Sequence, residues 1–237
     1  MATIRGCVDC HGDNLAGRVV LDDPAIGRLA GANLTGGRAS GALTSRDWER
    51  AVRHGVRSDS TGLLIMPAHE FTGISDEDLG SVIAYAQSLP GVAATPPLTR
   101  AGPVIRALSV AGGVTLIPAE IIDHGKAHPA RVETEPSARY GAYLAATCIG
   151  CHGPGLSGGK IPGAPPDWKP AANITPEGIG HYTEQSFMTA LRSGRRPDGS
   201  PIDTLMPWRL TKHMTDVELR AVYAYLRTVP PKPFGGR

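Results

Sequence analysis

Apolar residues at helical spacing follow a polar capping pattern at two places in the chain. Ser75 with Asp78, and Thr215 with Glu218, have the spacing of a helix N-cap and its third residue, and acidic residues fill each first turn. The apolar residues that follow lie on one helix face in each case: Leu79, Val82, Ile83 and Ala86, then Leu219, Val222, Tyr223 and Leu226. Each pattern predicts a helix near the end of one half of the chain.

Other local signals extend this prediction. Pro90 and Pro230 are expected to end the two helices, and Thr44 and Thr183 are predicted N-caps of two further helices. No stretch alternates strictly between apolar and polar residues for long enough to predict a sheet. The pattern predicts an all-α fold with long loops.

The two helical patterns belong to an internal repeat. When the sequence is shifted by about 140 positions, its two halves align in the same order. The matching segments include 33–35 with 173–175, 51–55 with 190–194, 66–67 with 206–207, 75–79 with 215–219 and 84–90 with 224–230. We therefore predict two domains of similar structure.

Composition narrows the class of protein. Hydrophobic residues make up 41% of the chain and charged residues 19%, as in ordinary globular proteins, while 30 glycines and 21 prolines favour loops. The net charge of +2 comes without a basic run, which argues against nucleic-acid binding. The longest uncharged stretch, 107–119, is too short to span a bilayer.

All four cysteines lie in two Cys-x-x-Cys-His motifs. The first is Cys7, Cys10 and His11, and the second is Cys148, Cys151 and His152. Two intervening residues put both sulfurs on one helical turn, where they can bond two vinyl groups of one porphyrin, and the adjacent histidine can then ligate iron. The motifs predict two covalently bound c-type haems.

Other uses of the cysteines explain the sequence less well. A thioredoxin-like pair needs a βαβ setting, which the surrounding glycines and prolines do not favour. A zinc site needs four ligands, and each motif offers only three. A disulfide within Cys-x-x-Cys would be strained and would leave both histidines unexplained.

Two methionines are candidates for the sixth iron ligand. Met66 and Met206 recur at matching positions, and a proline follows each one. Met188 fits a helix pattern and Met214 has no counterpart in the first half, so both are interpreted as core residues. Ligation by His and Met fills both axial positions with protein groups, which favours electron transfer over catalysis at the iron.

On these motifs the chain resembles the class I cytochromes c, and in particular the dihaem, two-domain cytochromes of bacteria. Those proteins often serve as cytochrome subunits of periplasmic or membrane-associated dehydrogenases. The resemblance implies that His11 and His152 are proximal ligands and that Met66 and Met206 are distal ligands. It also implies redox protein partners and a site in the periplasm or at the outer face of the cytoplasmic membrane.

The resemblance suggests further residues around each haem. Pro24 and Pro165 match the family proline whose carbonyl accepts the ring N–H of the proximal histidine, with Pro162 and Pro166 as alternatives in the second domain. Arg53 and Arg192 are candidates for pairing with haem propionates, and solvated helix surface is the alternative for both.

The domains are predicted as 1–91 and 138–237, joined by a linker over 92–137 that is rich in proline and alanine. Residues 118–124 are apolar enough to pack against a domain or to form part of a docking surface. By the family pattern, 139–146 form a first helix that packs on the last one, and this helix is truncated before Cys7. Covalent haem attachment requires export, so we expect a signal or anchor encoded upstream of Met1.

These observations predict a dihaem c-type cytochrome that is itself not an enzyme. It would relay electrons from a dehydrogenase or a respiratory or photosynthetic complex to an acceptor. Two other classes remain as alternatives. One is a dihaem enzyme, such as a peroxidase or a thiosulfate-oxidising cytochrome, and the other is a haem-sensing or haem-storage module.

Overall fold

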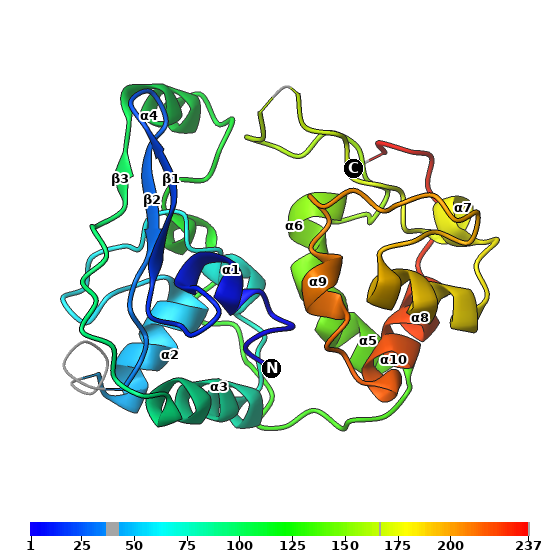
Figure 1. The fold of residues 1–237 in the computed structure, drawn as a ribbon, viewed down its shortest axis with the longest axis horizontal. Coiled ribbons are helices and arrows are strands. Elements are labelled where there is room, and N and C mark those ends of the chain that lie inside the picture. Colours follow the sequence, from blue (N-terminus) through cyan, green and yellow to red (C-terminus); the bar gives the residue numbers. More distant parts are fainter. Residues whose placement is uncertain (37–42, 166, 237) are drawn as a thin grey trace. The chain divides into compact units, whose positions relative to one another are not determined.

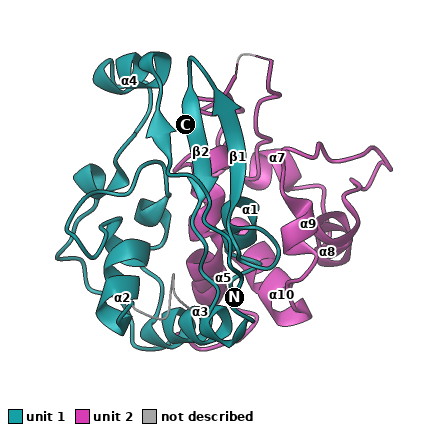
Figure 2. Ribbon diagram, turned by 60° about the vertical axis from the view of Figure 1, so that its left-hand side comes forward, with its two compact units in different colours: residues 1–131 teal, residues 132–237 magenta. Residues whose placement is uncertain are grey.

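A computed structural model describes residues 1–36, 43–165 and 167–236 of the chain (Figure 1). The chain divides into two compact units, residues 1–131 (unit 1) and 132–237 (unit 2), which Figure 2 shows in different colours. Helices dominate both units, as the sequence predicts. None of the described helices is long and apolar enough to cross a membrane.

Unit 1 consists of short helices, a small sheet and long connections. Its elements are α1 (Cys7–His11), β1 (Arg18–Asp23), β2 (Gly27–Gly31), α2 (Ser45–His54), η1 (Ala68–Glu70), α3 (Asp76–Ser88), β3 (Arg100–Ala101), α4 (Pro103–Val110) and η2 (Pro118–Ile121). α2 packs against α3 and η1, and both β1 and β2 contact α1.

Unit 2 repeats four of these helices, α1, α2, η1 and α3, in the same order. Its elements are α5 (Ala138–Leu144), η3 (Ala145–Cys148), α6 (Ile149–His152), α7 (Pro176–Ile179), α8 (Glu184–Ser193), α9 (Trp208–Thr211) and α10 (Asp216–Leu226). α5 packs so closely on α10 that a Cβ at Gly141 would lie 1.9 Å from the Ala221 carbonyl oxygen. The predicted contact between the first and last helices is confirmed here, whereas residues 2–6 of unit 1 form turns.

The predicted helix starts are confirmed. The side chains of Thr44, Ser75, Thr183 and Thr215 each accept a hydrogen bond from the backbone N–H three residues later. Each cap provides an acceptor for one N–H that would otherwise lack a partner in the first turn.

The prediction that the chain has no sheet is wrong. β1, β2 and β3 form an antiparallel sheet in that order, with Arg18 opposite Gly31 and Gly27 opposite Ala101. The strands are short, and β1 has no alternating pattern because all of its apolar residues are exposed. The residue that indicates the hairpin is Asp23 in its turn, because the Asp23 carboxylate accepts hydrogen bonds from the N–H groups of Ala25 and Ile26.

The segment 92–137 differs from the predicted linker. Its residues up to 131 belong to unit 1, where they form β3, α4 and η2. The Asn33 side-chain amide donates to the carbonyls of Val92 and Ala94, and the Thr99 hydroxyl bonds the backbone of Ala30. These long-range hydrogen bonds fold the segment back onto the unit.

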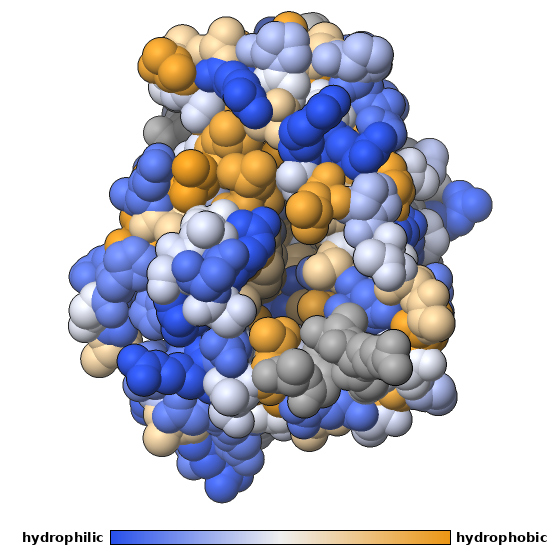
Figure 3. Space-filling view, turned by 90° about the vertical axis from the view of Figure 1, so that its left-hand side faces the viewer, coloured by the Kyte–Doolittle hydropathy of each residue, from blue (hydrophilic) through white to orange (hydrophobic). Residues whose placement is uncertain are grey.

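Much of the exposed apolar surface of unit 1 lies on β1 and on the segment 92–131. The large apolar residues exposed there are Val19, Val20 and Leu21 of β1, Val92 and Leu98 before β3, Val104, Leu108 and Val110 of α4, and Ile121 of η2. Figure 3 views the side of the molecule that carries these elements, and apolar residues gather among hydrophilic ones on it.

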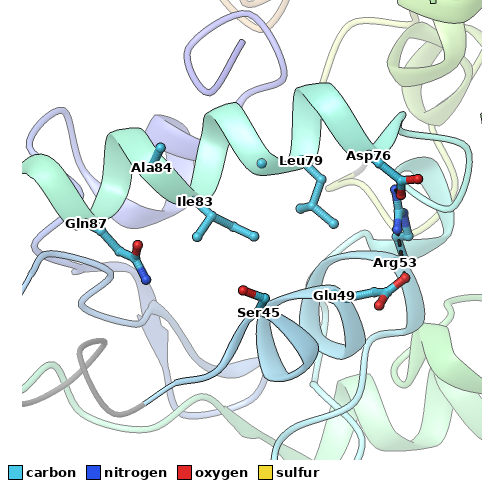
Figure 4. A pocket seen from close by; sticks show the side chains of 9 residues that line it. Ser45, Glu49, Arg53, Asp76, Leu79, Ile83, Ala84 and Gln87 are labelled. Carbon is cyan, nitrogen blue, oxygen red and sulfur yellow. Dashed lines mark hydrogen bonds and ion pairs between the residues drawn. The ribbon is translucent and has the colours of Figure 1, made fainter. Parts of the chain in front are cut away.

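Arg53, the candidate partner of a haem propionate in unit 1, lies at the junction of α2 and α3. Its side chain is only 2% exposed, and it forms ion pairs with Glu49 at 2.7 Å and with Asp76 at 2.8 Å (Figure 4). Two of its nitrogens also donate to the Ile74 carbonyl. Its donors therefore serve to join the C-terminal turn of α2 to the start of α3.

Arg192 takes the same place in unit 2, between α8 and α10. It pairs with Asp216 and donates to the Met214 carbonyl, but its side chain remains 42% exposed. Here too the candidate for a propionate contact forms an ion pair between two helices. The repeat thus keeps an arginine at this helix junction in both units.

The groove between α2 and α3 is open, while its counterpart in unit 2 is filled. Gly80 and Ile83 line the groove in unit 1 (Figure 4). Tyr223 stands in place of Ile83 in unit 2, where its ring contacts Phe187 and its hydroxyl donates to the Tyr182 carbonyl at 2.8 Å. Neither Cys-x-x-Cys-His motif lines the groove.

Glu70 occupies a place that unit 2 gives to an apolar residue. It lies four residues after Met66, and at the same distance from Met206 unit 2 has Leu210, which is 6% exposed. Burial raises the pKa of the Glu70 carboxyl from 4.5 to about 7. The folded state therefore holds the Glu70 proton to a higher pH than the unfolded chain does.

Replacing Glu70 should make stability less dependent on pH. Between pH 4.5 and about 7 the folded state binds more protons than the unfolded state, so its free energy of unfolding falls as pH rises through this window. Glu70→Leu should raise the stability of unit 1 more at about pH 8 than at about pH 5. We expect a difference of at least about 1 kcal/mol, or roughly 2–4 °C in Tm. Thermal unfolding at both pH values measures it, with the exposed Glu120→Gln as control. An equal gain in stability at both pH values would contradict this prediction.

Candidate haem-binding sites

Each Cys-x-x-Cys-His motif forms one short helical turn. The first motif is α1, and the second spans the end of η3 and α6. All four cysteines are free thiols. Burial raises the pKa of the Cys7 thiol to about 11, and it also raises the pKa of Cys10. A redox-active Cys-x-x-Cys pair has a lowered pKa, so unit 1 does not fit a thioredoxin-like role.

The two histidines are oriented in the same way. Nδ1 of His11 lies 2.7 Å from the Ala32 carbonyl oxygen, and Nδ1 of His152 lies 2.7 Å from that of Ala172. Burial lowers the pKa of His11, which favours the neutral ring. A neutral ring that donates from Nδ1 keeps the lone pair of Nε2 for a metal.

The acceptors of these hydrogen bonds differ from the predicted prolines. Pro24 lies in the turn between β1 and β2, and the Pro165 carbonyl accepts the Trp168 N–H at 3.1 Å. Of the alternatives, Pro166 lies outside the described residues. The hydrogen bond that the resemblance assigns to the carbonyls of Pro24 and Pro165 is thus made to the carbonyls of Ala32 and Ala172.

A repeated loop after each histidine explains why these carbonyls are in place. The sequence His-Gly-x-x-Leu-x-Gly occurs at 11–17 and at 152–158. Leu15 and Leu156 are buried at positive φ, and each carbonyl accepts the N–H of the residue that follows Asn33 or Asn173. A Cβ at Gly17 or Gly158 would overlap backbone atoms next to Ala32 or Ala172. This repeat is a sequence signal that would have located the acceptors.

The asparagines of the matching segments 33–35 and 173–175 secure the same region. The Asn33 and Asn173 carboxamide oxygens each accept two hydrogen bonds, from the N–H and the hydroxyl of the threonine two residues later. Their NH₂ groups donate to Val92 and Ala94 in unit 1, and to Lys232 in unit 2. The segment that carries each acceptor carbonyl is thus tied to the residues that follow α3 in unit 1 and α10 in unit 2.

Met66 and Met206 lie in loops with the same backbone conformation. Pro67 has φ −78° and ψ 54°, and Pro207 has φ −77° and ψ 52°. In both loops the N–H two residues after the methionine donates to the methionine carbonyl at 2.7 Å, which closes an inverse γ-turn. Both methionines are partly exposed, unlike Met188 and Met214, which are buried as core residues.

The donor set of each unit fits haem c. Each unit has two free thiols on one turn, a histidine held by its Nδ1 and a methionine in a loop of the same shape. Two buried donors, Trp48 Nε1 and Ser157 Oγ, have no hydrogen-bond partner among the described residues, and propionate oxygens are acceptors of the kind they lack. Within the described ranges no three His, Cys, Asp or Glu side chains form a metal cluster.

Comparison with known proteins agrees with this donor set. The chain is 28% identical to the cytochrome c subunit of alcohol dehydrogenase (quinone) from Gluconobacter oxydans (strain 621H), over 99% of this chain and 54% of the relative. It is 25% identical to the gluconate 2-dehydrogenase cytochrome c subunit of Pantoea cypripedii, over 98% of this chain and 58% of the relative.

A third similarity is stronger but shorter. The chain is 39% identical to the fructose dehydrogenase cytochrome subunit of Gluconobacter japonicus, over 39% of this chain and 21% of that protein. The chain spans little more than half the length of the Gluconobacter oxydans and Pantoea cypripedii relatives.

The family model for cytochrome c matches residues 138–230. This range contains Cys148, Cys151, His152 and Met206 and the helices α5 to α10. Residues 138–230 are therefore a cytochrome c domain.

Proposed function

We propose that the chain is a dihaem c-type cytochrome that transfers electrons and has no catalytic site of its own. The observation that carries this proposal is the recurrence of one haem-binding arrangement in both units, although the family model matches only the second. Bound haem c would supply one-electron redox chemistry.

The proposed roles of the residues are the same in both units. Cys7 and Cys10 would bond one haem, and Cys148 and Cys151 the other. His11 and His152 would ligate iron through Nε2, because Nδ1 is committed to a backbone carbonyl. Met66 and Met206 would take the opposite axial positions and so close both irons to substrate. The dihaem enzymes considered above need an open or unusual position, which a methionine in each loop does not favour.

The relatives suggest the kind of partner. They are cytochrome subunits of alcohol, gluconate and fructose dehydrogenases. We propose that this chain accepts electrons from a dehydrogenase subunit of that kind and passes them to a further redox protein. The proposed location is the periplasm or the outer face of the cytoplasmic membrane, where c-type haems are attached.

The haem content tests the dihaem proposal. Protein produced with the haem-attachment machinery should contain two haems per chain by the pyridine haemochrome assay, and both should survive acid-acetone extraction because thioethers are covalent. The double variants C7A/C10A and C148A/C151A should each retain one haem. One haem in the unaltered chain, or haem that the acid-acetone extracts, would contradict the proposal.

Methionine variants test the axial ligands. Met66→Leu and Met206→Leu keep most of the side-chain volume but remove the thioether, so each should convert one haem to a high-spin or altered state. A potential lower by on the order of 0.1 V is expected, within the range of about 0.8 V that axial ligands span. Met188→Leu, at a buried methionine of α8, is the control. Redox titrations that do not differ from the control would refute the assignment.

A copurification experiment tests the partner. A tagged chain, expressed in its own cells, should carry a dehydrogenase subunit with it, and addition of that enzyme's alcohol or sugar substrate should reduce both haems. The C7A/C10A variant, which lacks one haem, shows whether the substrate can reduce the remaining haem when the other is absent. If no dehydrogenase copurifies and no such substrate reduces the haems, the proposed partner is wrong.

A further inference from the structure

The two methionine loops have the same shape but are supported differently. In unit 2 the support is local. The carbonyl of Asp203 accepts the Met206 N–H at 3.0 Å, its carboxylate accepts the Leu205 N–H at 3.0 Å, and that carboxylate also pairs with Lys169 at 2.9 Å. The residues just before Met206 are thus held by one side chain of the same loop.

Trp208 adds a second support in unit 2. It lies two residues after Met206, and its indole covers Gly194 at the C-terminal end of α8. A Cβ at Gly194 would lie 2.5 Å from Trp208 Cε2, so the ring rests directly on the glycine. This contact fixes the far side of the methionine loop to a helix.

Unit 1 has no tryptophan at this place. The residue two after Met66 is Ala68, and the matching glycine is Gly55 at the end of α2. Ala68 and Ala119 both lie over Gly55. A Cβ added at Gly55 would lie 3.2 Å from the Ala68 Cβ and 3.7 Å from the Ala119 Cβ. Ala119 belongs to residues 116–124, which we call the strap.

The strap also contacts the residue next to the methionine. The Leu116 carbonyl accepts the Ile65 N–H at 2.9 Å, and Ile65 has a φ of 65°. A Cβ at Gly62 would lie 2.7 Å from Ile117 Cγ2, so Ile117 packs against the start of the same loop. The strap therefore touches the chain on both sides of Met66.

Two features hold the strap on unit 1. Pro118 is fully buried, and Ile122 is only 9% exposed. His124 lies with its Nδ1 3.1 Å from Nδ1 of His54 and its Nε2 3.0 Å from the Ala119 carbonyl oxygen. These two contacts of the His124 ring join the end of the strap to the end of α2.

We propose that the strap is a positioning element that holds Met66 toward the iron of unit 1, in the place that Trp208 and Asp203 take in unit 2. The inference rests on the proposed ligation by Met66. Methionine ligation in the two units then depends on different parts of the chain. Loosening of residues 116–124 affects one haem only.

Competition by imidazole tests the strap. The ferric full chain with both haems is titrated with imidazole, and loss of the long-wavelength charge-transfer band of methionine-ligated haem is followed. Ile117→Ala should strengthen imidazole binding at one haem about tenfold, because the lost packing weakens the hold on Met66. Val110→Ala, in α4 of the same segment and 92% exposed, should change neither haem. Trp208→Ala should strengthen binding at the other haem.

Met66→Leu identifies which phase of the titration belongs to unit 1. If Ile117→Ala leaves that phase unchanged, or shifts both phases equally, the strap is not a positioning element for Met66. If Met66→Leu itself shifts neither phase, the proposed axial ligand is wrong and the strap loses its role with it. Should Ile117→Ala not yield folded protein, Ala119→Gly is the milder variant. It should act in the same direction, and no change at the unit 1 haem would again refute the inference.

Discussion

The hydrogen bond from each motif histidine to a backbone carbonyl sets the geometry on which both units depend. The carbonyl lies 21 residues after His11 and 20 residues after His152, and the distance is 2.7 Å in both. A ring held by Nδ1 can present Nε2 in one direction only, so the loop that follows must return to the same place in each unit. Leu15 and Leu156 at positive φ, and the close packing of Gly17 and Gly158, are the means by which it returns.

The features that sequence could predict are those with local causes. A threonine or serine cap acts over three residues, so the starts of α2, α3, α8 and α10 were predictable. The internal repeat made the second unit a check on the first, and it singled out Met66 and Met206 among five methionines. Their loops have one backbone conformation, although whether they ligate haem stays a prediction.

The features that sequence did not predict depend on contacts between distant residues. Arg53 is buried because Asp76 and the Ile74 carbonyl meet it from α3, and nothing near Arg53 in sequence indicates this. The packing of residues 92–131 on unit 1 was not predicted for the same reason, since Asn33 binds Val92 and Ala94 across unit 1. The prolines chosen as acceptors were placed by family resemblance, whereas the path of the loop is set by the leucine and glycine that follow each histidine.

The hairpin of unit 1 has a consequence for behaviour in concentrated solution. β1 is an edge strand, and Val19, Val20 and Leu21 on it are 38–44% exposed, a combination that usually recruits a strand from another molecule. Arg18, Asp22 and Asp23 flank these residues, and the pairing with β2 is irregular between Val19 and Leu21. Charge and irregular register limit the length of any added ladder. A strand from another molecule that paired with β1 would therefore form only a short ladder.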